Sequence, residues 1–276
     1  MSIDKKSIPV FILAGGLGTR LSEETYLKPK PMVEIGDIPL LVHIMRWYYS
    51  YGFDDFVICA GYRGFEIKNY FLTYRHHFEN LDIDYRTPNA TTPKSFSHAE
   101  RASEKWRVRV VDTGNVTFTG GRLARAFDEI SKHQKIDDFA LTYGDGLCNV
   151  DLDSELEFHR SHQRIGTVMT VRPRSRFGEL QIEADHAVSF LEKPADRQPA
   201  VNGGYFFFQN GFRKYLSTDE ACILERQPLE KLAQDRQLMV YRHNDFWIPI
   251  DTMSDKNSVQ SIWNSGNVPW VRRKEK

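Results

Sequence analysis

Short apolar runs alternate with longer amphipathic segments through the first half of the chain. Four of these runs have the length and apolar content of buried strands: Val10–Leu13, Phe56–Ala60, Val108–Val111 and Phe139–Thr142. The segments between them predict helices over Leu40–Tyr51, Phe65–Tyr74 and Leu123–Ile130. Strands that alternate with helices indicate a mainly parallel sheet covered by helices, with ligands bound at the carboxyl ends of the strands.

The second half mixes closely spaced strands with helices. Strands are predicted over Thr167–Val171, Glu179–Ile182, Ala187–Phe190 and Tyr205–Phe208, some of them antiparallel, and helices over Glu225–Gln234 and Lys256–Trp263. We therefore predict an α/β fold with a Rossmann-like, mainly parallel mixed sheet flanked by helices, and a small β-rich part. A chain of 276 residues can form one large α/β domain, with halves over about 1–145 and about 146–276.

Composition narrows the class of protein. The 37 basic residues balance the 37 acidic ones, whereas a general nucleic-acid or membrane-surface binder needs excess positive charge. The N-terminus lacks the layout of a secretory signal, and no apolar run approaches the roughly 18 residues of a membrane span. Cys59, Cys148 and Cys222 form no C-x-x-C pair and are expected to be reduced. We expect a cytoplasmic protein without nucleic-acid or membrane partners.

A glycine-rich loop follows the first predicted strand. It runs from Ala14 to Leu21 as Ala-Gly-Gly-Leu-Gly-Thr-Arg-Leu, and Lys28-Pro29-Lys30-Pro31 comes shortly after it. Glycines let the backbone approach phosphate closely, and successive N–H groups form an anion-binding concavity. Arg20 and Lys30 supply positive charge to phosphate oxygens. The dinucleotide fingerprint needs glycine where Leu21 stands, and the P-loop pattern is absent, so the motif predicts a different triphosphate-binding loop.

Two acidic residues follow apolar segments. Asp145 lies between glycines directly after a predicted strand, and Asp251 follows the apolar and aromatic run 246–250. Mg²⁺ is usually bound through one or two carboxylates together with substrate phosphates and water, so both residues are candidate ligands. A plain Gly-Asp-Gly turn is the alternative for Asp145. For Asp251 the alternative is a helix N-cap, which Thr252 or Ser254 could also provide.

A third group of residues fits a phosphorylated acceptor. Glu192 can accept hydrogen bonds from hydroxyl groups, Lys193 can meet a monophosphate, and Asn202 can both donate and accept. Gly203 allows close approach of the backbone. A surface loop followed by a β-bulge is the structural alternative.

Other signals have simpler structural readings. Asp151-Leu152-Asp153 resembles an Asp-x-Asp metal motif but is more simply the solvated start of a helix. The aromatic run 47–51 predicts helix packing or an oligomer face. The segment 86–105 lacks periodicity, so a lid, an interaction arm and a solvated linker all remain open.

Together these motifs resemble the sugar-1-phosphate nucleotidyltransferases, whose signature is Gly-Gly-x-Gly-Thr-Arg-Leu followed by Pro-Lys-Pro. The longer strings Leu13–Thr25 and Lys28–Gly36 resemble the bacterial glucose-1-phosphate cytidylyltransferase branch. Most other branches place a proline where this chain has Ser22-Glu23-Glu24-Thr25. The resemblance extends along nearly the whole chain.

The resemblance implies a nucleotidyltransferase of GT-A-like fold with a sugar-binding β-rich part. It implies Mg²⁺-assisted in-line transfer of a cytidylyl group from CTP to a sugar 1-phosphate, most directly glucose 1-phosphate, giving a CDP-sugar and pyrophosphate. It also implies a homo-oligomer. The residues implied are Arg20 and Lys30 for catalysis; Leu13, Ala14, Gly15, Gly16, Gly18, Thr19, Gly61, Tyr62, Thr142 and Gly144 for the nucleotide; Tyr143, Gly178, Glu192, Lys193, Asn202 and Gly203 for the acceptor; and Asp145 and Asp251 for the metal.

One segment departs from that branch. Where its members read Gly-Arg-Phe-Gly-Ala-Leu-Asp-Ile, the stretch Arg172–Ile182 has Glu179 for alanine, Gln181 for aspartate and two additional arginines. Extra positive charge could suit a more anionic acceptor in lipopolysaccharide, capsule or other surface-polysaccharide synthesis; neutral drift is the alternative. A glycosyltransferase would leave Lys30 and Arg20 without a purpose. An inactive binding subunit would be expected to lack the lysine, the arginine or an acid, and all are present.

Overall fold

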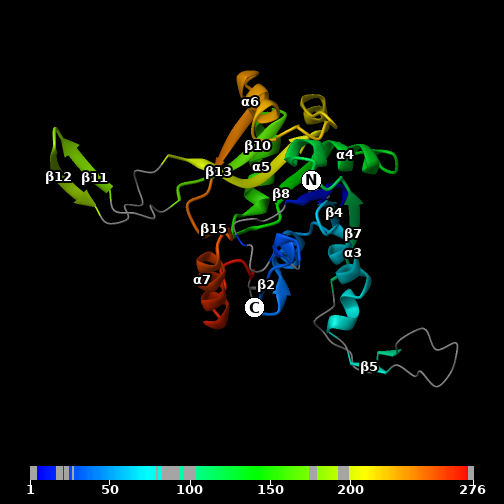
Figure 1. Ribbon diagram of the computed structural model, residues 1–276. Helices are drawn as coiled ribbons and strands as arrows, with labels where there is room; N and C mark the ends of the chain where they lie inside the picture. Colours follow the sequence, from blue (N-terminus) through cyan, green and yellow to red (C-terminus); the bar gives the residue numbers. More distant parts are fainter. Residues whose placement is uncertain are drawn as a thin grey trace.

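The computed structural model describes residues 5–16, 21, 25–26, 28–78, 80–82, 94–95, 104–173, 179–191 and 199–272. A seven-stranded sheet forms its centre (Figure 1). In spatial order the strands are β14 (Leu238–Arg242), β10 (Gly166–Val171), β13 (Val201–Gln209), β8 (Asp138–Tyr143), β1 (Val10–Ala14), β4 (Asp55–Ala60) and β7 (Arg107–Asp112). Only β13 is antiparallel to its neighbours in this sheet. The prediction of a mainly parallel mixed sheet is confirmed.

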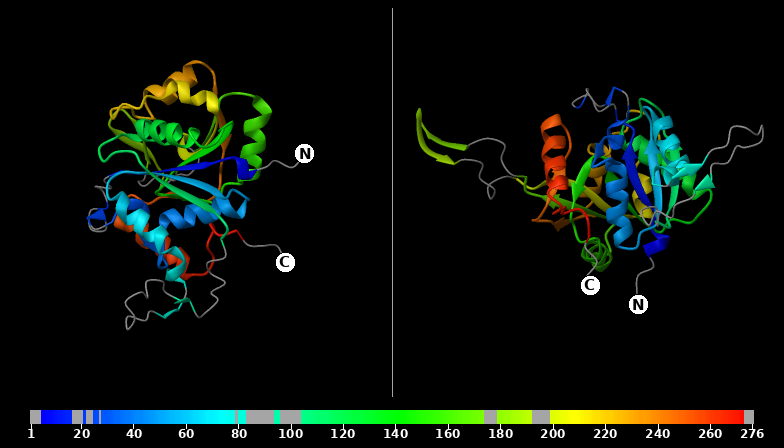
Figure 2. Two further views of the ribbon diagram at one scale, coloured as in Figure 1. Left: turned by 90° about the vertical axis from the view of Figure 1, so that its right-hand side faces the viewer. Right: turned by 90° about the horizontal axis from the view of Figure 1, so that it is seen from below.

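Helices cover both faces of the sheet (Figure 2). One layer contains α2 (Leu40–Ser50), α3 (Gly64–Leu72), α5 (Leu152–His162) and α7 (Met253–Asn264); the other contains α4 (Thr119–Ser131), α6 (Gln227–Gln234) and the 3₁₀ helix η6 (Asn210–Tyr215). Alternate residues of β1 enter the two cores: Val10 and Ile12 pack with α2, whereas Phe11 and Leu13 pack with α4. A strand buried on both faces is apolar throughout, which is why the pattern of hydrophobic positions revealed it.

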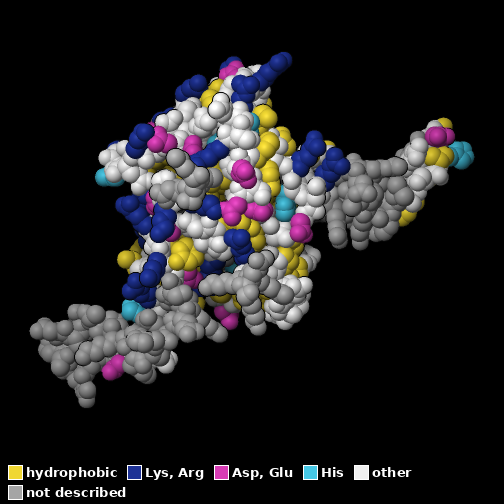
Figure 3. Space-filling view, turned by 180° about the vertical axis from the view of Figure 1, so that it is seen from behind, with side chains coloured by type: hydrophobic (Ala, Val, Ile, Leu, Met, Phe, Trp, Pro, Cys, Tyr) yellow, Lys and Arg dark blue, Asp and Glu magenta, His cyan; other side chains and the backbone are white. Residues whose placement is uncertain are grey.

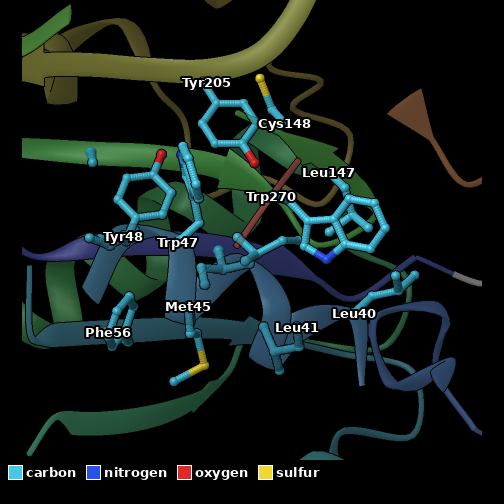
Figure 4. Close-up of a cluster of buried hydrophobic side chains, with 14 of the residues drawn as sticks. Leu40, Leu41, Met45, Trp47, Tyr48, Phe56, Leu147, Cys148, Tyr205 and Trp270 are labelled. Carbon is cyan, nitrogen blue, oxygen red and sulfur yellow. The ribbon is translucent and has the colours of Figure 1, made fainter. Parts of the chain in front are cut away.

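The aromatic run on α2 packs into the core. Trp47 and Tyr48 are buried, and both side chains point from α2 toward the side of the cluster that contains Tyr205 (Figure 4). The rings of Tyr48 and Tyr205 stack with centroids 5.8 Å apart, and Trp47 Nε1 donates a hydrogen bond to the carbonyl of Val150. Helix packing is therefore the role of the first two residues of this run.

Smaller elements lie outside the central sheet. Two-stranded ribbons pair β9 (Gly146–Cys148) with β15 (Trp247–Pro249), β2 (Glu34–Ile35) with β3 (Ile38–Pro39), β5 (Leu81–Asp82) with β6 (Lys94–Ser95), and β11 (Glu179–Glu183) with β12 (His186–Leu191). Further 3₁₀ turns are η1 (Lys5–Ser7), η3 (Lys30–Met32) and η4 (Tyr74–His77). The β11–β12 hairpin projects away from the main body (Figure 1). Most of the segment 86–105 lies outside the described residues.

Several expectations from composition can be compared with the structure. All three cysteines are free; Cys59 and Cys148 are buried and Cys222 is half-buried. Within the described ranges, every helix is too short or too polar to cross a bilayer. Basic and acidic side chains are interspersed over the face shown in Figure 3, without a large patch of one sign.

Candidate active site

The site lies where β1 and β8 end side by side. Leu13 is paired with Tyr143 in the parallel ladder, and the backbone N–H of Gly144 donates to the carbonyl of Leu13 at 3.0 Å. A Cβ atom on Gly144 would lie 2.7 Å from Pro31. Glycine is therefore required here, because it lets the segment carrying Lys30 close against the end of β8.

A pocket of about 300 Å³ opens at this edge; we call it the glycine-loop pocket. Its lining residues are Leu13, Ala14, Gly15, Gly16, Lys30, Pro31, Thr117, Phe118, Thr119, Arg122, Tyr143, Gly144, Asp145 and Asp251. Five of the predicted nucleotide-binding residues are in this set. Gly18, Thr19 and Arg20 lie outside the described residues. Gly61 and Tyr62 follow β4 and are not among the lining residues, although Gly61 contacts Arg122.

A second pocket of about 300 Å³ adjoins the first; we call it the acceptor pocket. It is lined by Thr142, Tyr143, Asp145, Gly146, Asn202, Gly203, Gly204, Tyr205, Trp247, Pro249 and Asp251. Predicted acceptor residues Tyr143, Asn202 and Gly203 are thus brought together. Thr142, predicted for the nucleotide, lines this pocket instead. Gly178, Glu192 and Lys193 lie outside the described residues.

Lys30 lies between two carboxylates at the junction of the pockets. Its Nζ donates to Asp145 Oδ2 at 2.5 Å and to Asp251 Oδ1 at 2.7 Å. Burial alone lowers the pKa of Lys30, but the charge of Asp145 and the hydrogen bonds with both aspartates outweigh it and raise that pKa above its ordinary value. The ammonium group is therefore charged, and it is held in place by two salt bridges.

The cap of α7 accounts for the position of Asp251. Thr252 is the N-cap, and its hydroxyl accepts a hydrogen bond from the Asp255 N–H. The Asp255 carboxylate accepts in return from the backbone N–H groups of Asp251 and Thr252. The alternative that Asp251 is the cap is thereby excluded, and its carboxylate is directed to Lys30.

Backbone pairing brings the two acidic segments together. Pro249 of β15 pairs with Gly146 of β9, and the N–H of Ile250 donates to the carbonyl of Asp145 at 2.9 Å. The β9–β15 ribbon thus holds residues more than a hundred positions apart at one point. Neither of its strands was predicted, because three-residue strands give no periodicity that can be read from the sequence.

A network around Tyr143 shapes the acceptor pocket. The Tyr143 hydroxyl donates to Glu225 and accepts from the Asn202 amide at 3.2 Å. Burial and the charge of Glu225 raise the pKa of Tyr143, so this hydroxyl stays protonated. Trp247 donates to the Gly203 carbonyl at 2.7 Å, which fixes the opposite wall.

Arg122 is a functional-site residue that the sequence patterns did not reveal. It is 4% exposed, and its guanidinium donates to the carbonyls of Gly15, Ala60, Gly114 and Asn115 at 2.6–3.3 Å. It thereby ties together the loops that follow β1, β4 and β7. One signal was available: Arg122 precedes Ala126 by four residues and so falls on the apolar face of α4.

The donor set at the junction fits a divalent cation. Two carboxylates converge on one ammonium group, and in the described ranges no cluster of three or more histidine, cysteine or acidic residues is arranged to hold a metal. Mg²⁺ needs only one or two protein carboxylates when substrate phosphates and water supply the remaining ligands. Asp145 and Asp251 therefore suit a metal that arrives with substrate.

The chain belongs to the nucleotidyl transferase family, whose model matches residues 9–255, and this family makes it a nucleotide-transferring enzyme. It is 42% identical over 259 residues to the glucose-1-phosphate cytidylyltransferase of Salmonella typhi, covering 94% of this chain and 97% of that protein. It is 38% identical over 259 residues, with the same coverage, to a probable glucose-1-phosphate cytidylyltransferase of Bacillus subtilis. The resemblance predicted from the motifs is confirmed.

Solved structures agree on the fold. A putative glucose-1-phosphate thymidylyltransferase from Bacillus anthracis superposes with a TM-score of 0.63 at 15% identity, covering 98% of both chains. HddC from Yersinia pseudotuberculosis gives a TM-score of 0.63 at 21% identity, covering 93% of this chain and 99% of that one. At this level of sequence identity, the similarity shows a shared fold alone.

Proposed function

We propose that this protein transfers a cytidylyl group from CTP to a sugar 1-phosphate and releases pyrophosphate. The observation that carries the proposal is the junction itself, where two pockets share Asp145 and Asp251 and Lys30 lies between these carboxylates. A nucleotide in one pocket and a phosphorylated acceptor in the other would meet there. CTP and glucose 1-phosphate are the first substrates to test, because close relatives carry the name glucose-1-phosphate cytidylyltransferase.

The reaction needs no covalent enzyme intermediate. An oxygen of the acceptor phosphate attacks the α-phosphorus, a new P–O bond forms, and the bond to the leaving pyrophosphate breaks in line. Catalysis then rests on positioning and charge neutralisation. The glycine-loop pocket holds the triphosphate, and the Lys30 ammonium offsets charge at the α-phosphate. We assign Arg20 to the leaving pyrophosphate, and Lys193 and Glu192 to the acceptor, from the sequence motifs alone.

We propose Mg²⁺ as the cofactor, held by Asp145 and Asp251. When bound, the metal offsets the repulsion between the triphosphate and the acceptor phosphate. The support is the convergence of these two carboxylates at the boundary of both pockets. In this assignment residues 1–145 bind mainly nucleotide, and residues 146–276 bind mainly acceptor.

We also propose a cytoplasmic homo-oligomer that supplies an activated sugar for lipopolysaccharide or capsule synthesis. Use of CTP and three free cysteines support that compartment. The β11–β12 hairpin supports assembly, because an isolated two-stranded ribbon is marginally stable and this one exposes Leu180, Val188 and Phe190. Light scattering coupled to gel filtration measures the assembly directly.

The test of the proposed function is product formation. Purified protein is incubated with CTP, glucose 1-phosphate and Mg²⁺, and pyrophosphate and CDP-glucose are quantified separately. We expect equal amounts of both products, slower reaction with ATP, GTP, UTP and dTTP, and loss of activity in excess chelator. Absence of pyrophosphate release with every nucleotide and acceptor would overturn the proposal.

A further inference from the structure

Two arginines beside the acceptor pocket have no acidic partner in the part of the chain that the structure describes. Arg172 directly follows β10 and Arg242 ends β14; both are exposed. They line a separate pocket of about 410 Å³ together with Thr170, His243 and Asn244. Among the described residues, none forms a salt bridge or a hydrogen bond with either guanidinium group, whereas Arg213 and Arg109 each grip a carboxylate. Two positive charges therefore face one cavity, and no described carboxylate pairs with either of them.

This cavity lies at the same edge of the sheet as the reaction junction. Strand β13 is antiparallel to both β8 and β10, so β8 and β10 run in one direction, and β14 is parallel to β10. Their carboxyl ends consequently share an edge, where α/β sheets bind ligands. The β11–β12 hairpin also leaves the body from the end of β10 and returns at β13 (Figure 1).

Strand register links the cavity to the acceptor pocket. Thr170 of β10 lies opposite Asn202 of β13 on one side and opposite Arg242 of β14 on the other. Residues directly opposite one another in adjacent strands place their side chains on the same face. Adjacent strands are about 4.8 Å apart, so the backbone of Asn202 in the acceptor pocket and that of Arg242 are about 10 Å apart along this row. Asn202 is the member of the row that lines the acceptor pocket.

We propose that Arg172 and Arg242 form a second anion-binding subsite of the acceptor pocket. It would bind a phosphate or carboxylate at the end of the acceptor remote from the phosphate that is cytidylylated. The planar, five-donor guanidinium group matches both kinds of anion. The 1-phosphate of an uncharged hexose would leave both arginines unused. The inference rests on the proposed function, because it assumes that the reacting phosphate lies at Asp145 and Asp251.

The second anionic group takes no part in bond making, so its effect is on selectivity. Three acceptors separate the cases: glucose 1-phosphate, glucuronic acid 1-phosphate and glucose 1,6-bisphosphate. We expect the wild-type kcat/KM for at least one acceptor with two anionic groups to exceed that for glucose 1-phosphate by about tenfold or more. Charge-assisted hydrogen bonds to a bound anion provide a difference of this size. Preference for glucuronic acid 1-phosphate identifies a carboxylate site, and preference for the bisphosphate identifies a phosphate site.

The variant that tests the two arginines is Arg172→Gln with Arg242→Gln. In this double variant, the ratio of kcat/KM for acceptors with two anionic groups to kcat/KM for glucose 1-phosphate falls to near one. The matched control is Arg164→Gln, because Arg164 is an exposed arginine preceding the opposite end of β10. That control keeps the wild-type ratio. A ratio that is equal in the wild type and the double variant would overturn the subsite.

A binding measurement separates this inference from the proposed reaction. Calorimetric titration with glucose 1,6-bisphosphate and with glucuronic acid 1-phosphate, without nucleotide, is run on the wild type and on both variants. An affinity about tenfold weaker in the double variant alone supports the subsite even where no cytidylyl transfer occurs, in which case only the proposed function fails. Affinities equal across the three proteins for both compounds contradict the subsite, whatever the outcome of the transfer assay.

Discussion

Arg122 and Gly15, which faces it, form part of one wall of the glycine-loop pocket. A methyl group added to Gly15 would lie 2.2 Å from the guanidinium, whereas one added to Gly16 would have no neighbour within 4 Å. We predict that Gly15→Ala lowers the free energy of unfolding by about 1–3 kcal/mol, because overpacking forces a buried group to shift. Gly16→Ala is the matched stability control. Urea denaturation measures both, and equal midpoints for the two variants would disprove this role of Gly15.

Removing the guanidinium itself has a larger effect. Arg122→Leu leaves several buried carbonyls without a donor, so we predict a loss of about 3 kcal/mol or more in unfolding free energy. Arg122→Lys keeps the charge but loses the forked N–H donors of the guanidinium group. Its unfolding free energy therefore lies between those of the wild type and the leucine variant. A raised KM for CTP accompanies both changes. If the leucine variant unfolds at the wild-type denaturant concentration, Arg122 does not hold these loops together.

Residues of the site differ in how far sequence alone could identify them. Lys30 was predicted as a site residue from the motif that follows the glycine-rich loop, and Asp145 and Asp251 because each follows an apolar run. The structure places the three in contact; their chemical roles stay predictions. Arg122 could not be assigned that way. Its function depends on three loops that converge only in the folded sheet.

At the scale of elements, the cap of α7 controls the position of a site carboxylate. We predict that Thr252→Ala costs about 1 kcal/mol in stability, as loss of an N-cap usually does. It also lowers kcat, because Asp251 precedes the cap directly and shares the Asp255 carboxylate with it. Thr252→Ser restores both properties. Ser254→Ala, in the same turn but outside the capping box, should match the wild type in denaturation and turnover.

Helix α5 carries an acidic residue on its buried face. Burial raises the pKa of Glu155 from an ordinary 4.5 to about 8, and neither carboxylate oxygen has a hydrogen-bond partner among the described residues. Between these pKa values the folded state holds a proton that the unfolded state has lost. This contribution to stability is thus complete below about pH 4.5 and declines as pH rises to about 8.

Glu155→Gln removes that dependence. Relative to the wild type, we predict that the stability of the variant increases by about 1.4 kcal/mol for each pH unit in this window. Chemical denaturation at several pH values measures the difference. A constant difference between pH 5 and pH 8 would show that Glu155 titrates normally in the folded protein.

Some elements were predictable and others were not, for identifiable reasons. Strands β1, β4, β7 and β8 were predicted because each contains a run of apolar residues that the pattern reveals. The start of α4 was missed because Gly120 and Gly121 are poor helix formers. They are required by packing, since a Cβ on Gly120 would lie 2.6 Å from Cys222 and one on Gly121 would lie 2.4 Å from the Asp219 carbonyl.

At the scale of the whole molecule, the sheet brings distant parts of the chain to one edge. The glycine loop after β1, the Asp145 turn after β8 and the Asp251 segment before α7 meet there around Lys30. The alternation of strands and helices predicted that the candidate site residues would gather at the carboxyl ends of the strands. The same pattern did not predict β14, because this strand belongs to the sheet only through its pairing with β10.

The central claim is that Lys30 acts at the point where nucleotide and acceptor meet. The most direct test is kcat for CDP-glucose formation by Lys30→Met at saturating CTP, glucose 1-phosphate and Mg²⁺. Lys28→Met is the control, because Lys28 pairs with Glu34 outside both pockets. We predict that Lys30→Met lowers kcat about 100-fold or more, as loss of a group that stabilises transition-state charge does, while Lys28→Met stays close to the wild type. A wild-type kcat in Lys30→Met would contradict the account.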